Sequence, residues 1–300
     1  MQNTSSGRTR VMPKGRNLRR RKRWTAWLGI VPVLVFCFAI EIVPIMMMVR
    51  GSVIDSKGNF TLANYASLGI PLYVNSFINS IKLSSLSALI GTALGTLIGY
   101  VIYRWPLNRV REALITLSDV TTNFAGAPLA FAFIIILGST GIVTQFFLQY
   151  LNIKIYPEFS VYSLWGLVLA YVYFQLPLMV LLIIPAFTGL RKEWFESAQN
   201  LGASSFQFWR RIGLPVLTPS LVSGLVLLFA NAFGAYATAY TLTGSSLTLA
   251  TIQIGFTVTG EVRHDPGIGL AMALISLLIM GSCIASYQWA TRAARRWSSR

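Results

Sequence analysis

The chain has 300 residues, of which 54% are hydrophobic and 11% charged, and its mean hydropathy is +0.61. A soluble domain carries roughly a quarter charged residues and covers its surface with polar groups, so this composition excludes a soluble globular protein and indicates one that resides in lipid. It also excludes a disordered chain, and the presence of only two cysteines, Cys37 and Cys283, excludes a disulfide scaffold.

The formal net charge of +16 is concentrated beside the apolar segments. Nine of the 25 Lys and Arg residues precede the first apolar run, and most of the others flank later runs. A basic segment beside a bilayer is attracted to anionic lipid and fixes the orientation of the chain. We therefore interpret the charge as a topology signal and expect a lipid bilayer, not nucleic acid, as the partner of these residues.

Six apolar runs are long enough to cross the hydrocarbon core, which takes about 20 residues. They lie near residues 26–49, 76–103, 112–138, 163–188, 216–241 and 268–290. The first run is too long for a cleaved signal and contains Glu41, so we expect a retained span. Prolines inside the runs predict bends or breaks in the helices, because neighbouring helices can satisfy the freed backbone groups in a membrane. These prolines are Pro32, Pro44, Pro128 and Pro177.

One orientation satisfies the positive-inside rule along the whole chain. Placing the basic arm, residues 1–25, in the cytoplasm puts 20 of the 25 basic residues on the cytoplasmic side. We therefore predict an all-α membrane protein with both termini cytoplasmic, an outer loop at residues 50–75 and a basic cytoplasmic tail at 291–300. Residues 142–151, in a later outer connection, have apolar side chains at helical spacing and are expected to lie at the membrane interface.

The cytoplasmic connection at residues 191–215, RKEWFESAQNLGASSFQFWRRIGLP, carries the most specific local signals. Helix-forming residues are interrupted at Gly202, Ser204 or Ser205 can cap a second short helix that continues to Ile212, and Pro215 begins the next span. Two short helices joined at a glycine form a compact projection, which implies a partner with a complementary surface. The alternative is an amphipathic loop that rests at the membrane interface without a partner.

This connection resembles the signature of the membrane subunits of bacterial ABC importers, which reads EAA, three residues, G, nine residues, I, one residue, LP. The matching positions are Glu196, Ser197, Ala198, Gly202, Ile212, Leu214 and Pro215. Ser197 is the one departure, and it keeps a small side chain. The resemblance extends over most of residues 70–290 and is closest in look to permeases for polyamines, iron, sulfate or aminoethylphosphonate.

The resemblance implies the type I, MetI-like importer fold, with a peripheral first span at residues 26–49 and a core of five spans at residues 76–290. It implies three partners: a dimeric ABC ATPase, which would bind ATP in place of any cofactor on this chain, a second permease that is a homologue, and an external solute-binding protein. It also implies roles within the loop. Glu196 would cap or pair within the helix pair, and Ala198 and Gly202 would allow close backbone approach. The residues expected to reach the ATPase are Phe206, Trp209 and Arg210, with Leu214 and Pro215 joining the element to the fifth span.

Polar side chains inside the spans are costly in lipid and therefore mark candidate positions on a substrate path. Asp119 and Asn123 lie four residues apart, on one helix face just before an expected break at Gly126. A helix-packing hydrogen bond explains them equally well. The fifth span offers a second set, Asn231, Tyr236 and Tyr240, with packing again as the alternative.

Nothing in the sequence indicates chemistry on the chain itself. No loop of the form GxxxxGK is present, and no nucleophile motif or metal-ligand cluster, so we expect no catalytic residue, no metal site and no enzyme activity of its own. Six spans also fit a secondary transporter or a channel. Neither of these classes accounts for the connection at residues 191–215.

Overall fold

The computed structural model describes residues 30–55, 58–154, 156–260 and 265–298, with side chains through residue 288. The chain divides into two compact units, residues 1–50 and residues 51–300, which are described separately. Within the described residues the regular structure is helical, apart from one isolated antiparallel bridge between Ile54 and Phe60.

The described part of the first unit is a single helical segment. It begins at Ile30, widens into the π-helical turn η1 (Phe38–Ile42) and continues as α2 (Val43–Ser52), which runs into the second unit. The widened turn lies just before Pro44, whose ring would clash with the carbonyl four residues back in a regular helix. Pro32 and Pro44 therefore lie inside a continuous helix and do not break it. The predicted basic arm lies outside the described residues.

Six helical segments of the described chain are long and apolar enough to cross a membrane, in agreement with the predicted number. Their bounds are Ile30–Ser52, Pro71–Arg104, Ala127–Leu151, Leu164–Thr188, Ser205–Gly234 and Pro266–Gln288.

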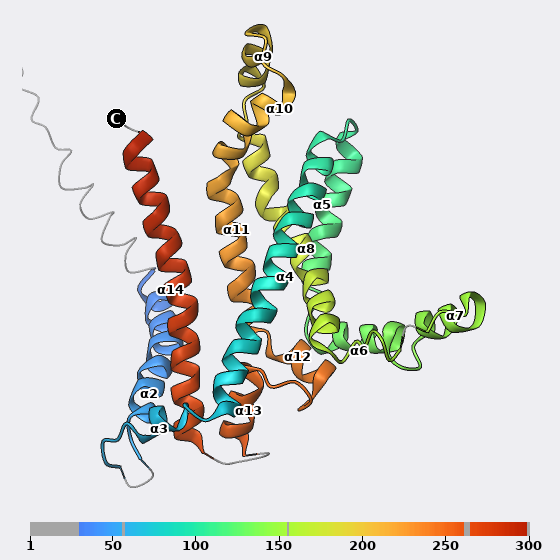
Figure 1. Cartoon of the computed structure of the whole chain (residues 1–300). Coiled ribbons are helices and arrows are strands. Elements are labelled where there is room, and N and C mark those ends of the chain that lie inside the picture. Colours follow the sequence, from blue (N-terminus) through green and yellow to red (C-terminus); the bar gives the residue numbers. More distant parts are fainter. Residues whose placement is uncertain (1–29, 56–57, 155, 261–264, 299–300) are drawn as a thin grey trace, which may run out of the picture. The chain divides into compact units, whose positions relative to one another are not determined.

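The second unit is built around α4 (Pro71–Arg104), which packs along α8 (Leu164–Thr188) and α11 (Leu214–Gly234) (Figure 1). The α4 face toward α8 carries Gly91, Gly95 and Gly99, four residues apart. A Cβ atom on Gly95 would lie 2.6 Å from the Cβ of Met179 on α8, and Cβ atoms on the other two glycines would be similarly crowded. Because lipid is as apolar as the core, this close backbone packing is a main source of association between the two helices.

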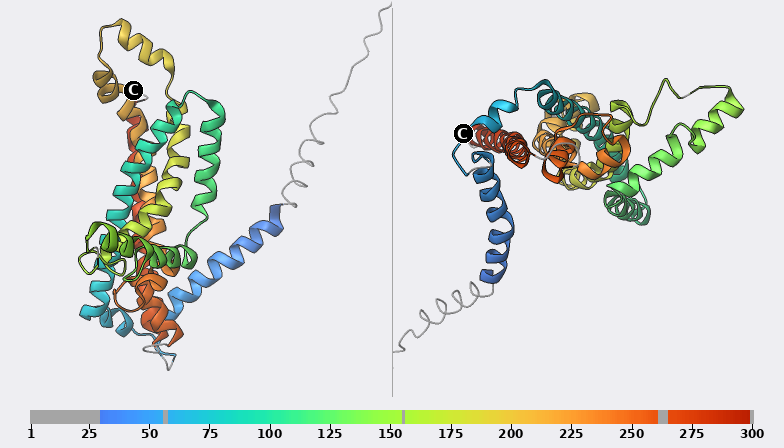
Figure 2. Two further views of the ribbon diagram at one scale, coloured as in Figure 1. Left: turned by 90° about the vertical axis from the view of Figure 1, so that its right-hand side faces the viewer. Right: turned by 90° about the horizontal axis from the view of Figure 1, so that it is seen from below.

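The third predicted span, residues 112–138, is not one helix. It is divided into α5 (Asn108–Thr122), which packs on α8, and α6 (Ala127–Leu137), and Gly126 between them has a φ of 76°. From α6 the chain leads into α7 (Ile142–Leu151), and both run across the direction of the bundle (Figures 1 and 2). The break predicted near Pro128 is confirmed, and the apolar segment of spanning length here is Ala127–Leu151.

The fifth predicted span also ends earlier than residue 241. Helix α11 stops at Gly234, and Ala235, with φ −76° and ψ 88°, separates it from α12 (Tyr236–Thr243). Next comes α13 (Ala250–Thr259), which packs against α4 and α14. Hydropathy alone did not reveal this change because the apolar composition continues across the turn.

The last helix, α14 (Pro266–Ser298), packs on α11, on α13 and on the short α3 (Ala63–Ser67). It is helical through Ser298, so most of the predicted tail at 291–300 continues this helix. The predicted outer loop at 50–75 contains α3 and the first turn of α4, since α4 begins at Pro71 rather than near residue 76.

Candidate functional site

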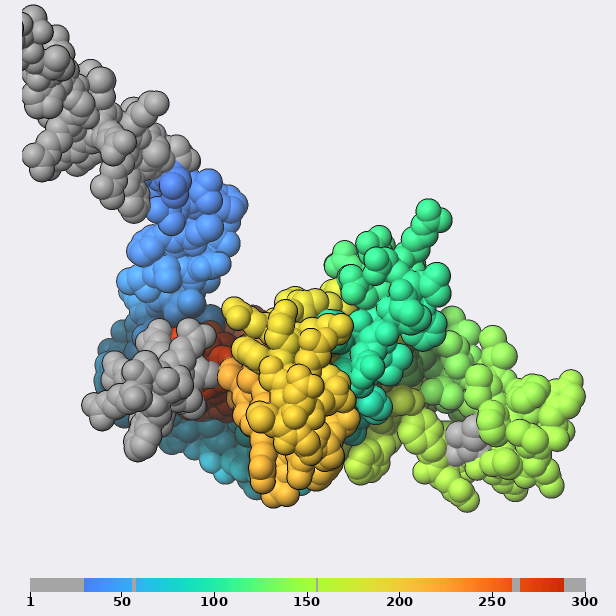
Figure 3. Space-filling model, turned by 90° about the horizontal axis from the view of Figure 1, so that it is seen from above, coloured from blue at the N-terminus to red at the C-terminus, as the bar shows by residue number. Residues whose placement is uncertain are grey.

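A hairpin of two short helices stands beyond the ends of α8 and α11 (Figure 1). It consists of α9 (Lys192–Asn200) and α10 (Ser205–Phe208), and it passes through the π-helical turn η2 (Trp209–Gly213) into α11. Figure 3 looks down on this end of the molecule, where the yellow and gold atoms of the hairpin lie beside the teal-green atoms of the turn that joins α4 and α5. The helix pair predicted from residues 191–215 is therefore confirmed, although its second helix is continuous with the following span.

Local signals explain the hairpin turn. Gly202 has a φ of 79°, the left-handed region that favours glycine, and its N–H donates to the carbonyl of Gln199 over 2.9 Å. A Cβ atom on Gly202 would meet nothing within 4 Å, so inside this chain the glycine serves the backbone conformation rather than close packing. Ser204 then begins α10 with a capping box, because its hydroxyl accepts from the N–H of Gln207 and the Gln207 amide oxygen accepts from its N–H.

The joint to α11 depends on Pro215 and Gly213. Pro215 is the second residue of α11, and in a regular α-helix its ring would clash with the carbonyl four residues earlier. The wider π-helical turn η2 comes directly before α11 and makes room for the ring. A Cβ atom on Gly213 would lie 2.4 Å from the ring of Trp209, so only glycine fits beneath that ring. The hairpin is therefore held at a defined angle to the span.

Aromatic contacts fix the inner face of the hairpin. The rings of Phe195 and Phe208 cross edge to face at 5.0 Å, and the ring of Trp209 meets that of Tyr100 on α4 edge to face at 5.3 Å. Trp209, one of the residues expected to reach the ATPase, is half-buried against α4 and joins the hairpin to the bundle. Its contact with the ATPase stays a prediction.

The outer face of the hairpin leaves the predicted residues Phe206, which is 73% exposed, and Arg210 open to the surroundings. Leu201, which the sequence analysis did not single out, is 88% exposed beside them. Glu196 pairs with Lys192 within α9 over 3.1 Å. An open groove of about 810 Å³ runs between α9 and the start of α11. The signature residues that line it are Ser197, Ala198, Gly202 and Ile212.

A second polar region lies where the third and fifth predicted spans break. The N–H of Gly126 donates to the hydroxyl of Thr238 on α12 over 3.0 Å. The hydroxyl of Tyr171, on α8, donates to the carbonyl of Ala235 over 2.7 Å. These two bonds satisfy backbone groups that the helix breaks release, as buried polar groups in a membrane require. The breaks are thereby tied into one region around α12.

The predicted substrate-path residues lie on three different helices. Asp119 and Asn123 are both exposed on α5, and the amide of Asn123 donates to the main-chain carbonyl of Asp119 over 3.0 Å. The bond lies within one helix, so it is not the packing bond between helices considered above. Asn231 is exposed on α11. Tyr236 and Tyr240 lie on α12, with their rings stacked at 5.3 Å.

A buried amide that we had not singled out links three helices. Gln175 on α8 is completely buried, and its side-chain amide donates to the hydroxyl of Ser87 on α4 and to the carbonyl of Leu228 on α11. Its amide oxygen has no hydrogen-bond partner in the described chain. The sequence did contain a signal, because a glutamine inside a span is costly in lipid.

The described residues contain no group of three or more His, Cys, Asp or Glu side chains placed to hold a metal ion.

Comparison with known proteins gives the class of the chain. Residues 91–296 match the family described as binding-protein-dependent transport system inner membrane component. The spermidine/putrescine transport system permease protein PotB of Escherichia coli (strain K12) is 26% identical over 267 residues, which are 88% of this chain and 95% of that protein. The probable sulfate transport system permease protein cysT of Prototheca wickerhamii is 31% identical over 169 residues, 55% of this chain and 62% of that protein.

Solved structures agree in fold. A bacterial ABC transporter involved in the import of the acidic polysaccharide alginate superposes with a TM-score of 0.73 at 16% identity, covering 93% of this chain and 99% of that one. The MetNI methionine ABC transporter superposes with a TM-score of 0.55 at 15% identity, covering 74% and 95%. The chain belongs to the family of binding-protein-dependent transport system inner membrane components, and it is a multi-pass permease subunit of an ABC importer. A secondary transporter and a channel are thereby set aside.

Proposed function

We propose that this permease forms the translocation path for a small solute together with a second, homologous permease, and that the α9–α10 hairpin couples the path to a separate ATPase. The hairpin carries this proposal. Its exposed tip, with Leu201 and Phe206, stands beyond the spans, while its base is fixed to α4 through Trp209. A rigid projection with an apolar tip suits insertion into a groove of a partner.

The helices α10, η2 and α11 are continuous, so in this proposal a movement of the hairpin moves α11. Force applied to the hairpin reaches α11 without a flexible linker, because the joint is filled by the Trp209 ring over Gly213. In this proposal Phe206 and Arg210 contact the ATPase, and Trp209 acts as the support behind them. Closure of the ATPases on ATP would turn the permease pair outward, so ATP site and path are linked through a coupling free energy.

The proposed setting is the bacterial inner membrane, with the hairpin and both termini in the cytoplasm, as the positive-inside distribution favours. ATP is bound by the ATPase, and this chain needs no cofactor. An external binding protein delivers the solute, which we place in the polyamine, phosphonate, sulfate or iron class. Around the helix breaks Tyr236, Thr238 and Tyr240 are neutral, so we assign discrimination between cationic and anionic solutes to the binding protein.

The test is purification of the complex with its ATPase, comparing wild type with Gly202→Asp. The matched control is Gly58→Asp, because Gly58 also has positive φ, 84° against 79°, and also has nothing within 4 Å of an added Cβ. We expect Gly202→Asp to abolish substrate-stimulated ATP hydrolysis while Gly58→Asp retains it. Unchanged transport and ATP hydrolysis in Gly202→Asp would contradict the proposal.

A further inference from the structure

A hollow of about 450 Å³ lies at the base of the hairpin, where α4 and α8 end. Four basic residues line it, from the end of α4, the start of α5 and the start of α9. They are Arg104, Arg111, Arg191 and Lys192. Figure 3 shows the turn between α4 and α5 beside the hairpin at this end of the molecule. The hollow therefore collects positive charge from three separate chain segments.

The described residues do not balance this charge. Lys192 has an acidic partner, Glu196, but no carboxylate of the described chain lies within ion-pair distance of Arg104, Arg111 or Arg191. Arg104 instead donates to the hydroxyl of Tyr100 over 3.0 Å. No acidic residue lines the hollow. Like charges held together lower stability unless an anion joins them, so the arrangement calls for an anionic ligand.

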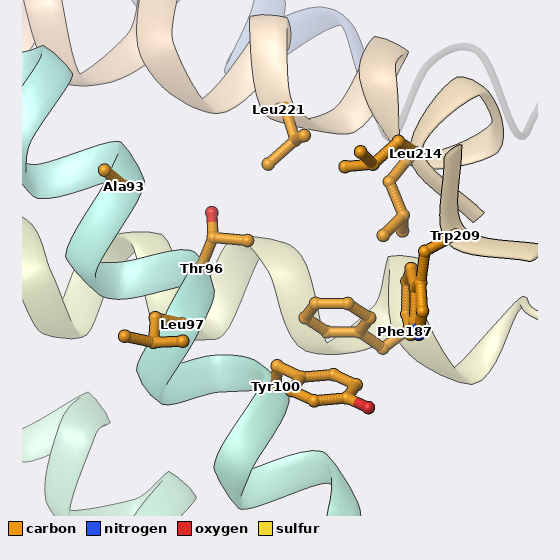
Figure 4. A pocket seen from close by; sticks show the side chains of 9 residues that line it. Ala93, Thr96, Leu97, Tyr100, Phe187, Trp209, Leu214 and Leu221 are labelled. Carbon is orange, nitrogen blue, oxygen red and sulfur yellow. The ribbon is translucent and has the colours of Figure 1, made fainter. Parts of the chain in front are cut away.

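An apolar hollow of about 300 Å³ adjoins the basic one and shares Tyr100 and Trp209 with it. In Figure 4 the rings of Tyr100, Phe187 and Trp209 gather at one end of this second hollow. Leu97, on its wall, lies seven residues before Arg104, or about 10 Å along α4. Positive charge, aromatic rings and an apolar space thus follow one another along the helix.

The order of charge, aromatic rings and apolar space matches the order of headgroups, interface and acyl chains in one leaflet of a membrane. The polar interfacial layer is roughly 6 Å deep on each side of the hydrocarbon, and tyrosine and tryptophan rings favour its level. An acidic segment of the ATPase would explain the charge but not the apolar space below it. The residues of the hairpin that are most exposed, Leu201 and Phe206, do not line this basic hollow.

We propose that the two hollows together bind an anionic phospholipid of the phosphatidylglycerol class, with its phosphate among Arg104, Arg111 and Arg191 and an acyl chain beside Leu97. Such a lipid would join the ends of α4 and α8 to the start of α9, so it would stiffen the base of the hairpin. The assignment of the hollows to the cytoplasmic leaflet rests on the proposed function; the lipid chemistry does not.

The experiment titrates the full-length purified permease, in nanodiscs of phosphatidylcholine, with fluorescent phosphatidylglycerol and with fluorescent phosphatidylcholine. Wild type is expected to prefer phosphatidylglycerol. Arg111→Gln should weaken phosphatidylglycerol binding about fivefold, the usual contribution of one basic residue near an anionic surface, and leave phosphatidylcholine binding unchanged. The matched control is Arg109→Gln, which removes the same charge from an exposed residue of α5 that does not line the hollow. It should change binding less than twofold.

A second variant tests the apolar half. Ala93 lines the apolar hollow, and Ala93→Leu should weaken long-chain phosphatidylglycerol several-fold while sparing a short-chain form. Equal binding of the two headgroups by wild type, or equal losses in Arg109→Gln and Arg111→Gln, overturns the proposal. Full displacement of the lipid by inorganic phosphate also overturns it, in favour of a soluble anion. Because the titration contains no ATPase, its failure and the failure of the coupling proposal are separate results.

Discussion

The hydroxyl of Thr238 accepts a hydrogen bond from the N–H of Gly126 over 3.0 Å, across 112 residues of sequence. Gly126 sits at the turn between α5 and α6, and Thr238 is on α12, just after the turn that ends α11. The two helix breaks of this permease are therefore joined directly. A change in the angle of α11 at the turn before α12 can therefore be transmitted through this hydrogen bond to the turn between α5 and α6.

Thr238→Val should lower the thermal stability of the permease in detergent. The variant keeps the shape of the side chain but leaves the partly buried N–H of Gly126 without its acceptor, which costs about 1 kcal/mol. The matched control is Thr243→Val on the same helix, where the hydroxyl is also buried but bonds only to the Ala239 carbonyl one turn back. Equal stability losses in the two variants would show that the link to Gly126 contributes nothing.

Gly95→Ala should loosen the packing of α4 on α8. The new Cβ would lie 2.6 Å from the Cβ of Met179, which no rotamer change relieves, so we expect a loss of about 1–3 kcal/mol. Gly281→Ala on α14 is the control, because its Cβ meets nothing within 4 Å. Alanine is the better helix former by about 1 kcal/mol, so the control should be neutral or stabilised. Unfolding monitored by tryptophan fluorescence distinguishes the two, and a neutral Gly95→Ala would refute the close packing.

The hairpin was predictable because its signals are local. Gly202, Ser204 and Pro215 each constrain the backbone through their own chemistry within a few residues, and the structure places a turn, a cap and a helix start at these positions. The side on which Trp209 lies was not predictable. Its direction depends on Tyr100, more than a hundred residues away, and a short amphipathic helix gives no rule for choosing between bundle and partner.

The spans were predictable in number but not in course. Hydropathy measures composition along the chain, and it stays high through Ala235 although the helix ends there. The break at Gly126 was predictable because glycine and Pro128 stand together. The spacing of Gly91, Gly95 and Gly99 was a readable sign of close helix packing, yet it does not name the partner helix. The structure identifies α8 as that partner helix.

Glu196→Gln should leave the stability of the permease almost unchanged but lower substrate-stimulated ATP hydrolysis. The ion pair with Lys192 is exposed on both sides, so its loss should cost only about 0.3 kcal/mol and leave the unfolding midpoint almost unchanged. If Glu196 acts at the ATPase interface, substrate-stimulated ATP hydrolysis should still fall at least threefold. Glu193→Gln removes the same charge from the first turn of α9, outside the signature, and provides the control. A matching fall in both variants would point to overall charge and not to the position of Glu196.

Phe206 and Phe208 are expected to have different roles on the hairpin, the first in binding the ATPase and the second in packing. They lie two residues apart on α10, yet the first is 73% exposed and the second 5% exposed against the ring of Phe195. Phe208→Ala removes a packed ring and should destabilise the hairpin by about 3 kcal/mol. Phe206→Ala removes no internal contact of that kind, so the permease should unfold as wild type does.

For ATPase binding the expected ranking of the two variants is the opposite, with the larger effect in Phe206→Ala. A largely exposed ring at a partner contact is a candidate hot spot, and its truncation typically weakens binding about tenfold or more. Titration of the permease with purified ATPase should therefore show the greater loss of affinity for Phe206→Ala at a temperature where both variants remain folded. Wild-type affinity in Phe206→Ala would place the ATPase contact elsewhere on the hairpin, with the groove beside Ala198 and Ile212 as the next surface to test.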